Sequence, residues 1–376
     1  MLYTNALVFL PERGFTVCGF RVENGSFSEI VAPDVDEPGA VDLGGRKVIP
    51  GLIDIHTHGN SGADFSDADA AGLERIARYL AANGVTSFCP TSMTLPYEIL
   101  SAAFETAAGL REKQPQGCAR LAGIHMEGPY FSEKKKGAQN AAYLRRPDFE
   151  GFQRLYEGCG GLISIVDLAP ELEGAADFVR KASALCTVSV AHTDADYAQT
   201  RAVYDAGARH LTHLYNAMPP IHHRKPGVIG AASENEAVSA ELICDGIHVH
   251  PSSVRMAFRL FGADRMVLIS DALRCCGMPD GSYELGGQQV FLAQNVARLA
   301  DGTIAGSATN LYDCMRNALR FGIARADAVR AATWNPARQI HALDRVGSIA
   351  NGKLADFVIC DAELNRKAVY LGGNPI

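Results

Sequence analysis

The central part of the chain alternates between two hydrophobic patterns. Short apolar runs, bounded by Gly, Pro or polar residues, are followed by segments in which apolar residues recur every three or four positions. This alternation predicts repeated strand and helix units and a parallel sheet. The runs that we interpret as strands are eight: GLIDIHTH, VTSFCPTS, LAGIHMEG, LISIVDLAP, TVSVAHTD, HLTHLYNA, AELICDGIHV and MVLISDA.

The segment after the first run illustrates the helical pattern. Residues 68–83 carry apolar side chains at a spacing that places them on one face of a helix. Gly84 follows directly, and glycine suits the left-handed position just beyond a helix C-terminus. We therefore expect a helix over 68–83. Its apolar face consists of Leu73, Ile76, Ala77 and Leu80.

The two ends of the chain have a different pattern. Apolar and polar residues alternate in short runs broken by Gly and Pro, which predicts antiparallel strands, with a turn at Asn351-Gly352 near the C-terminus. Both ends could pair in one small β-sandwich module. We predict that residues 1–49 and 343–376 form this module and that residues 50–342 form the parallel-sheet domain.

The parallel sheet could be open or closed. An open doubly wound sheet normally has a glycine-rich phosphate fingerprint after its first strand, and this chain has none there. The 376 residues suffice for a closed barrel of about 250 residues plus a small module. The predicted fold class is therefore α/β: a (β/α)8 TIM barrel with a small β-sandwich module formed by the N- and C-terminal segments.

Composition excludes several classes of protein. Hydrophobic residues make up 47% and charged residues 20%, as in ordinary globular enzymes. The net charge is −7 and no basic run exceeds Lys134 to Lys136, so we expect no nucleic-acid partner. The N-terminus has no basic leader and no window is apolar enough for a membrane span, so we expect no membrane partner and a cytoplasmic location. The ten cysteines lack CxxC spacing and are interpreted as buried, reduced thiols.

Six of the eight apolar runs end in residues that bind metals or protons. Because the C-terminal ends of barrel strands share one mouth, we expect these side chains to converge there. His56 and His58 are two positions apart and share a strand face, and imidazole is a favoured zinc ligand. His210 and His341 lie outside the pattern. The predicted cluster comprises His56, His58, Glu127, His192, His213, His248 and Asp271.

Each member of this cluster also has a structural interpretation. His192 could cap a strand, His213 could be a satisfied core histidine, and Glu127 could pair with Arg120. All of these structural interpretations would have to be correct at once for the metal site to be absent. The sequence therefore favours a site for one or two divalent ions. His125 shares the strand face of Glu127 one layer deeper, and we expect it in the core or supporting a ligand.

The sequence resembles the N-acetylglucosamine-6-phosphate deacetylases of the amidohydrolase superfamily over nearly its whole length. The matching segments appear in the family order. They are PGLIDIHTHG (50–59), GIHMEGPY (123–130), KKGAQN (135–140), AHTDAD (191–196), THLYNAMPPIHHRKPGVIG (212–230), DGIHVHP (245–251), ISDAL (269–273) and DGTIAGS (301–307).

The resemblance implies a metal-dependent hydrolase. Glu127 stands where many superfamily members have a carboxylated lysine that bridges two metals, and with His192 and His213 it would form the primary site. The presence of both His56 and His58 leaves room for a second ion. The metal would be zinc or iron, with Mn or Co as possible substitutes.

The resemblance also assigns the catalytic step to Asp271. This residue would be a further metal ligand and the general base that takes a proton as metal-activated hydroxide attacks the acetamide carbonyl. It would then act as a general acid and deliver the proton to the departing amine. The implied reaction, in amino-sugar catabolism, converts N-acetyl-D-glucosamine 6-phosphate to D-glucosamine 6-phosphate and acetate.

The phosphorylated amino-sugar substrate would contact a further set of residues. Arg224 lies in the basic segment 222–225, and a guanidinium offers a bidentate fork to phosphate, although a solvated loop charge is the alternative. Some family members use the arginine and histidine of a neighbouring subunit here, so we expect a homodimer. The substrate-binding residues implied by the resemblance are Ala138, Gln139, Asn216, Ala217, Arg224, His248, Ile304, Ala305 and Gly306.

Three alternatives remain open at the level of sequence. Another amidohydrolase, such as a cyclic amidase or nucleobase deaminase, would use the same barrel, but Glu127 in place of lysine and the presence of Arg224 disfavour it. A non-catalytic barrel used as a scaffold would show gaps among the ligands, and none is missing. The segment from Lys134 to Lys136 fits either a solvated loop or a mobile lid.

Overall fold

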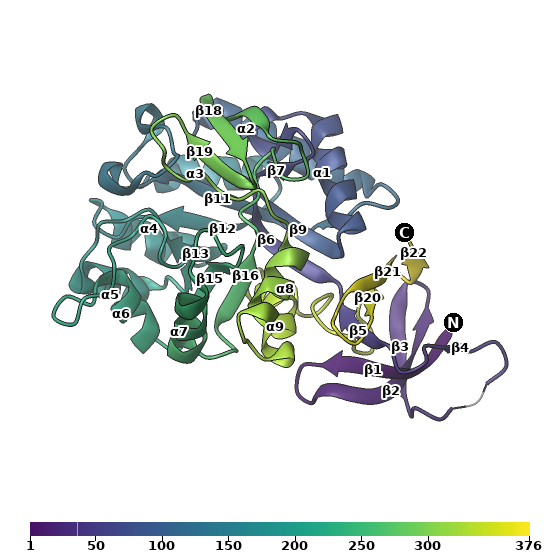
Figure 1. The fold of residues 1–376 in the computed structure, drawn as a ribbon. Coiled ribbons are helices and arrows are strands. Elements are labelled where there is room, and N and C mark those ends of the chain that lie inside the picture. Colours follow the sequence, from purple (N-terminus) through teal and green to yellow (C-terminus); the bar gives the residue numbers. More distant parts are fainter. Residues whose placement is uncertain (36) are drawn as a thin grey trace.

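The computed structural model describes residues 1–35 and 37–376. Figure 1 shows two parts: a barrel of strands surrounded by helices, and a small β module beside it that contains both chain termini. No helix in the described part of the chain is long and apolar enough to cross a membrane.

The barrel consists of eight parallel strands that follow one another in chain order, and the two-residue strand β10 (Arg120–Leu121) also pairs with β9 in the same sheet. It is closed between the last and first strands, where the Asp271 amide donates to the carbonyl of His56 at 2.9 Å and the His58 amide donates to that of Ala272 at 2.8 Å. All eight predicted runs are confirmed, and so is the TIM-barrel fold class. The strands are β6 (Leu52–Thr57), β9 (Val85–Ser92), β11 (Ile124–Tyr130), β12 (Ile163–Leu168), β13 (Thr187–Val190), β14 (His210–Leu211), β15 (Ser239–Ile243) and β16 (Met266–Ile269).

Helices cover the outside of the barrel, as Figure 1 shows. The helix predicted over 68–83 is confirmed as the first of them: Asp69 caps its N-terminus by accepting from the amides of residues 71 and 72, and Gly84 follows its end with φ +82°. The helices are α1 (Ala70–Ala82), α2 (Tyr97–Lys113), α3 (Phe149–Gly158), α4 (Ala175–Ala182), α5 (Tyr197–Ala206), α6 (Gly227–Glu234), α7 (Pro251–Phe261), α8 (Leu311–Arg320), α9 (Arg325–Ala332) and α10 (Trp334–Gln339).

The small module is one sheet built from both ends of the chain. Strand β5 pairs antiparallel with β20, which joins the two ends, and β1 also pairs in parallel with β4 and β5. Tyr3, Phe20, Phe27 and Phe357 are buried together in its core. The domain boundaries stay a prediction. The strands are β1 (Leu2–Leu10), β2 (Gly14–Glu23), β3 (Ser26–Val31), β4 (Val41–Asp42), β5 (Lys47–Pro50), β20 (Phe357–Cys360), β21 (Arg366–Leu371) and β22 (Asn374–Pro375).

The C-terminal segment differs from the sequence prediction in one respect. The turn at Asn351-Gly352 is present, but residues 346–350 before it form no strand, and β20 begins only at Phe357. The turn is held instead by β3, because the amide of Gly352 donates to the carbonyl of Phe27 at 2.7 Å. The expectation of a strand before the turn was therefore wrong.

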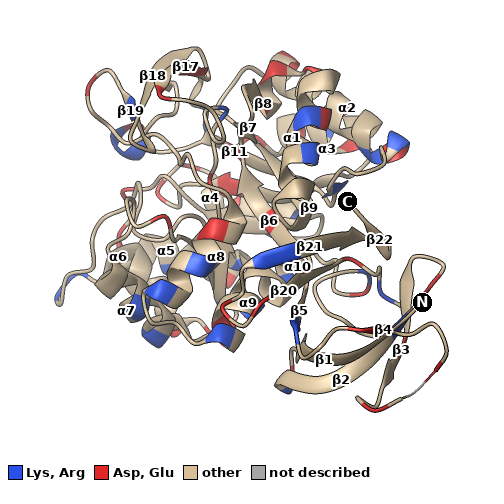
Figure 2. Ribbon diagram, turned by 45° about the vertical axis from the view of Figure 1, so that its right-hand side comes forward, with Lys and Arg blue, Asp and Glu red and all other residues tan. Residues whose placement is uncertain are grey.

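An insertion after β16 was not predicted. Strands β17 (Gly281–Leu285), β18 (Gln288–Ala293) and β19 (Val296–Leu299) form a separate antiparallel sheet. Its Leu285 is buried and reaches the barrel mouth. Figure 2 shows Lys and Arg interspersed with Asp and Glu over the outer helices, and further acidic residues towards the middle of the barrel.

Candidate metal centre and active site

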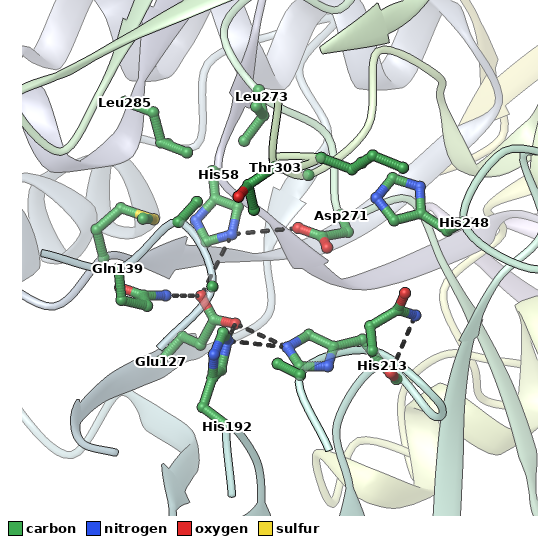
Figure 3. Close-up of a pocket in the computed structure, with 17 residues that line it drawn as sticks. His58, Glu127, Gln139, His192, His213, His248, Asp271, Leu273, Leu285 and Thr303 are labelled. Carbon is green, nitrogen blue, oxygen red and sulfur yellow. Dashed lines mark hydrogen bonds and ion pairs between the residues drawn. The ribbon is translucent and has the colours of Figure 1, made fainter. Parts of the chain in front are cut away.

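The strand ends predicted to carry the chemistry meet at the mouth of the barrel (Figure 3). His56 is fully buried and does not line the pocket, but its Nε2 lies 3.6 Å from Oε1 of Glu127. Ala305 is also buried behind the wall, and Arg224 lies on an exposed loop away from the pocket. The predicted residues that line the pocket are His58, Glu127, Ala138, Gln139, His192, His213, Asn216, Ala217, His248, Asp271, Ile304 and Gly306.

Three of these side chains are aimed into the mouth by an unusual backbone. His192, His213 and Asp271 follow the ends of β13, β14 and β16, and their φ angles are +44°, +33° and +50°. Left-handed backbone is costly for residues other than glycine and persists where surrounding structure enforces it. Its occurrence at three strand ends around one pocket marks this end of the barrel as the functional one.

The first cluster of ligand atoms is formed by Glu127, His192 and His213. The Nε2 atoms of His192 and His213 each lie 3.2 Å from Oε1 of Glu127, and they lie 3.1 Å from each other. Figure 3 shows both imidazoles on one side of the carboxylate. These three residues are the ones that the family resemblance assigns to the primary metal site.

A second cluster lies on the other side of Glu127. Nε2 of His58 is 3.4 Å from Oε2 of Glu127 and 3.3 Å from Oδ1 of Asp271. Nε2 of His56 is 3.6 Å from a carboxylate oxygen of each of the same two residues. Glu127 therefore stands between two pairs of histidines.

The hydrogen bonds behind the imidazoles decide whether these residues fit a cation. The Nδ1 atoms of His58 and His192 lie 3.1 and 2.9 Å from backbone carbonyls, and Nδ1 of His56 lies 2.9 Å from a carboxylate oxygen of Glu241. All three partners only accept, so each Nδ1 carries a proton, and in the neutral ring Nε2 presents its lone pair to the cluster. Such lone pairs repel one another and the two carboxylates unless protons or a metal cation lie among them. The residues fit a divalent metal.

The electrostatics lead to the same conclusion. Burial opposes ionisation of Glu127, but hydrogen bonds with His192 and His213 outweigh it and hold the pKa of this carboxyl well below its usual range. Burial alone would lower the pKa of His58, yet the hydrogen bond to Asp271 and the charge of Glu127 raise it to about 9. The site concentrates negative potential that attracts protons or metal ions.

Polar side chains hold the rim of the pocket. Gln139 donates from Nε2 to Oε2 of Glu127 at 2.7 Å and accepts from the Thr94 amide at 2.7 Å. Nδ1 of His248 lies 2.7 Å from Oδ2 of Asp245, whose Oδ1 accepts the backbone amide of His248 at 2.9 Å. Because Asp245 fixes Nδ1, the His248 ring presents its other nitrogen to the pocket.

One wall of the pocket is apolar. Met93, Leu273, Leu285 and Ile304 line it, and Figure 3 shows Leu273 and Leu285 on the side away from His192 and His213. Leu285 belongs to the inserted sheet, which is tied to the loop bearing Gln139 by the Gln288 to Ala138 carbonyl hydrogen bond. The insertion thus forms part of the site.

The segment predicted as a solvated loop or mobile lid contacts the site. The carbonyl of Lys135 accepts from His192 at 2.9 Å, while the exposed Lys134 pairs with Asp194 at 3.1 Å. Residues Glu133–Lys135 form a short 3-10 helix. Both interpretations stay open.

A buried polar network beneath the centre was missed by the sequence analysis. Glu241 and Asp167 are fully buried, and their carboxylates contact His56, His125 and His210. The predicted supporting place of His125 agrees with its bonds to the Ile55 carbonyl and Asp167. A charged residue inside an apolar strand run, as in AELICDGIHV, is the signal that could have identified Glu241.

The comparisons with known proteins agree with this geometry. The model of the Amidohydrolase family matches residues 47–376. The N-acetylglucosamine-6-phosphate deacetylase of Bacillus subtilis (strain 168) is 38% identical over 360 residues, which are 94% of this chain and 91% of that protein. The N-acetylgalactosamine-6-phosphate deacetylase of Escherichia coli O157:H7 is 36% identical over 86% of both chains.

A solved structure resembles the whole chain. It is a mutant N-acetyl-D-glucosamine-6-phosphate deacetylase from Mycobacterium smegmatis in complex with N-acetyl-D-glucosamine-6-phosphate, which aligns with a TM-score of 0.93 at 33% identity and covers 100% of this chain and 98% of that one. The matched family model spans most of the chain, and the sequence relatives are well above 30% identity over most of its length. The chain therefore belongs to the amidohydrolase family, among the N-acetylglucosamine-6-phosphate deacetylases.

Proposed function

We propose that this enzyme hydrolyses the acetamide of N-acetyl-D-glucosamine 6-phosphate to D-glucosamine 6-phosphate and acetate, in the catabolism of amino sugars. The observation that carries the proposal is the position of Glu127 between two histidine pairs at a barrel mouth, with Asp271 beside them. The names of the relatives supply the substrate class.

The same side chains would hold one or two divalent ions. Glu127, His192 and His213 would bind one, and His56 and His58 with Asp271 would bind the other. An ion held there would lower the pKa of a water toward ~7 and polarise the amide carbonyl. Imidazole and carboxylate ligands suit zinc or iron, and Mn or Co could take the place of either metal.

Asp271 is the proposed general base and acid. Burial opposes its ionisation, but the charge of His56 and the hydrogen bond with His58 lower its pKa, so the carboxylate is charged at neutral pH. It can take the proton of the attacking water while the new C–O bond forms at the carbonyl carbon. The same proton then passes to the nitrogen as the C–N bond breaks, because an amine leaves far more readily than an amide anion.

The two sides of the pocket suit the two parts of the substrate. The apolar wall formed by Met93, Leu273 and Leu285 suits the acyl methyl group, and Ile304 and Gly306 extend it. Asn216, Gln139 and His248 offer hydrogen bonds to the amide and sugar hydroxyls.

The substrate phosphate would need a cationic partner, and none of the described residues that line the pocket is Lys or Arg. Lys136 lies beside the pocket, but its Nζ contacts the carbonyls of Gly137 and Gln139, and Arg224 lies on an exposed loop. We propose a homodimer in which Arg224 of a second copy reaches the phosphate, and a cytoplasmic location, since a charged sugar phosphate does not cross a bilayer unaided. Sedimentation at assay concentration that found only monomer would contradict the shared site.

Acetate release from purified, metal-loaded protein tests the reaction. We expect chelator-sensitive release from N-acetylglucosamine 6-phosphate and much slower release from the unphosphorylated sugar. A third arm with N-acetylgalactosamine 6-phosphate addresses the activity named in one relative. No release from folded, metal-loaded protein would overturn the proposal, and faster release from the galacto epimer would reassign the substrate.

A further inference from the structure

Glu241 is a buried carboxylate that joins elements far apart in the sequence. It lies on β15 with no solvent exposure, and its Oε2 lies 2.9 Å from Nδ1 of His56, 185 positions away. The same oxygen accepts the backbone amide of His213 at 3.3 Å, and Oε1 lies 3.1 Å from Nε2 of His210. Strand β15 does not neighbour β6 in the sheet, so the side chain crosses the barrel interior beneath the mouth.

Glu241 decides which nitrogen of His56 carries the proton. Oε2 of Glu241 accepts the backbone amide of His213 and lies 2.9 Å from Nδ1 of His56, while Oε1 lies 3.1 Å from Nε2 of His210, so the carboxylate is placed as an acceptor for all three N–H groups. His56 must then carry its proton on Nδ1, and its Nε2 has no hydrogen-bond partner among the described residues. Without Glu241 the proton could move to Nε2, where Glu127 and Asp271 would accept it and block a metal.

The neighbouring cluster of His56, His125 and Glu241 is itself close enough to hold an ion. His125 argues against that interpretation. Its Nδ1 lies 2.9 Å from the Ile55 carbonyl and its Nε2 lies 3.0 Å from Asp167, so both nitrogens are already engaged with acceptors. Glu241 therefore acts on the metal centre from outside it.

We propose that Glu241 is a positioning residue that fixes His56 for a divalent ion at the His56 and His58 position, and so determines whether the enzyme holds a second ion. This inference rests on the proposed metal ligands. Carboxylates behind metal-bound histidines fix the tautomer and the ring orientation, and losing one typically lowers metal affinity by about 10- to 100-fold. The effect on the ion at Glu127, His192 and His213 should be small, because Glu241 touches only the backbone there.

The test is a zinc titration of metal-stripped protein in competition with a chromophoric chelator. We expect two ions per chain for the wild type. Glu241→Gln keeps the shape but replaces the charged acceptor with a weaker neutral one, so the weaker ion should lose about 10- to 100-fold in affinity while the tighter one is unchanged. His210→Gln is the matched control, because His210 touches the same carboxylate but no proposed ligand, and both ions should bind as in the wild type.

A double variant shows whether Glu241→Gln lowers the zinc affinity through His56. In His56→Gln protein, adding Glu241→Gln should change zinc binding no further. Four results would each overturn the inference. The single Glu241 variant could bind zinc as the wild type does, or it could bind both ions equally more weakly. The Glu241 substitution could cause a further loss in His56→Gln protein, or the wild type could bind only one ion. If Glu241→Gln does not fold, Glu241→Met combined with His210→Leu replaces both buried partners by apolar groups and takes its place.

The titration uses no substrate, so the two proposals fail separately. A protein that binds two ions in a Glu241-dependent manner but releases no acetate would refute the reaction and leave this inference standing. Acetate release by a protein that binds one ion would support the reaction and refute this inference.

Discussion

Two clusters of aromatic rings in this molecule differ in what they contribute to its stability. At the barrel mouth, the imidazoles of His192 and His213 meet edge to face with centroids 4.8 Å apart, and the carboxylate of Glu127 lies against both. In the terminal module, the rings of Phe357 and Tyr370 stack at 4.4 Å. Apolar burial stabilises the second cluster by itself. The first cluster brings two imidazole nitrogens and a carboxylate oxygen within 3.2 Å of one another and needs protons or a metal cation among them, so it serves chemistry at the expense of stability.

The loss of the proposed base should have the largest effect on the mouth. Asp271→Asn should lower kcat for acetate release by about 10²- to 10⁴-fold, because the amide cannot accept the proton of the attacking water. The melting temperature should stay near that of the wild type, since the mouth contributes little to apolar burial. Turnover at the wild-type rate would refute the assignment.

The opposite result is expected from the terminal module. Phe357 is fully buried and its ring centroid lies 5.1 Å from that of Phe20. Phe357→Ala should therefore lower the free energy of unfolding by about 3–5 kcal/mol, measured by denaturant titration. At a temperature where the variant is folded, kcat/KM should stay close to the wild-type value.

The inserted sheet offers a matched control for that substitution. Phe291 lies on β18 and its side chain is 42% exposed. Phe291→Ala should change the free energy of unfolding by no more than about 0.5 kcal/mol. If both Phe variants lost the same stability, the buried rings would not be what holds the module together.

A smaller effect is expected at the exposed basic loop. Arg224→Ala should raise KM for the phosphorylated sugar by about tenfold, the scale of one charge-assisted hydrogen bond of about 1.5 kcal/mol. It should leave the unphosphorylated sugar unaffected. Equal changes for both substrates would assign Arg224 to a solvated loop.

An effect of similar size is expected at the apolar wall. Leu285→Ala enlarges the space beside Leu273 and Met93, where we place the acyl methyl group. The ratio of kcat/KM for N-propionyl to N-acetyl substrate should rise about tenfold, because one added methylene is worth about 1–3 kcal/mol in an apolar pocket. An unchanged ratio would place the acyl group elsewhere in the pocket.

The sequence was sufficient for the barrel and for the residues at its mouth. The spacing of apolar residues and the position of a residue at the end of a strand are local signals in the sequence. Closure of the barrel brings the strand ends together, which is why His58, Glu127, His192 and Asp271 could be placed in one cluster. The same reasoning could place His56 in the cluster. It could not show that His56 is fully buried and does not line the pocket, because the burial of a side chain depends on how far its strand extends towards the mouth.

Features that depend on contacts across the fold were not predictable. Glu241 lies in an apolar run, and only the barrel brings it to His56. The inserted sheet after β16 has short strands with weak periodicity, and its place over the pocket depends on tertiary contacts such as that of Gln288 with Ala138. The strand expected before Asn351 is absent because that backbone bonds to β3 instead.

The seam that closes the barrel has a consequence for folding. Asp271 follows β16 and bonds to the carbonyl of His56, and beside it Ser270 donates to Asp54 at 2.6 Å across 216 positions of sequence. Contacts of such long range form late, because the loop entropy must be overcome first. The proposed base thus reaches its place only when the ring of strands is complete, and recovered activity after refolding reports the last step of assembly.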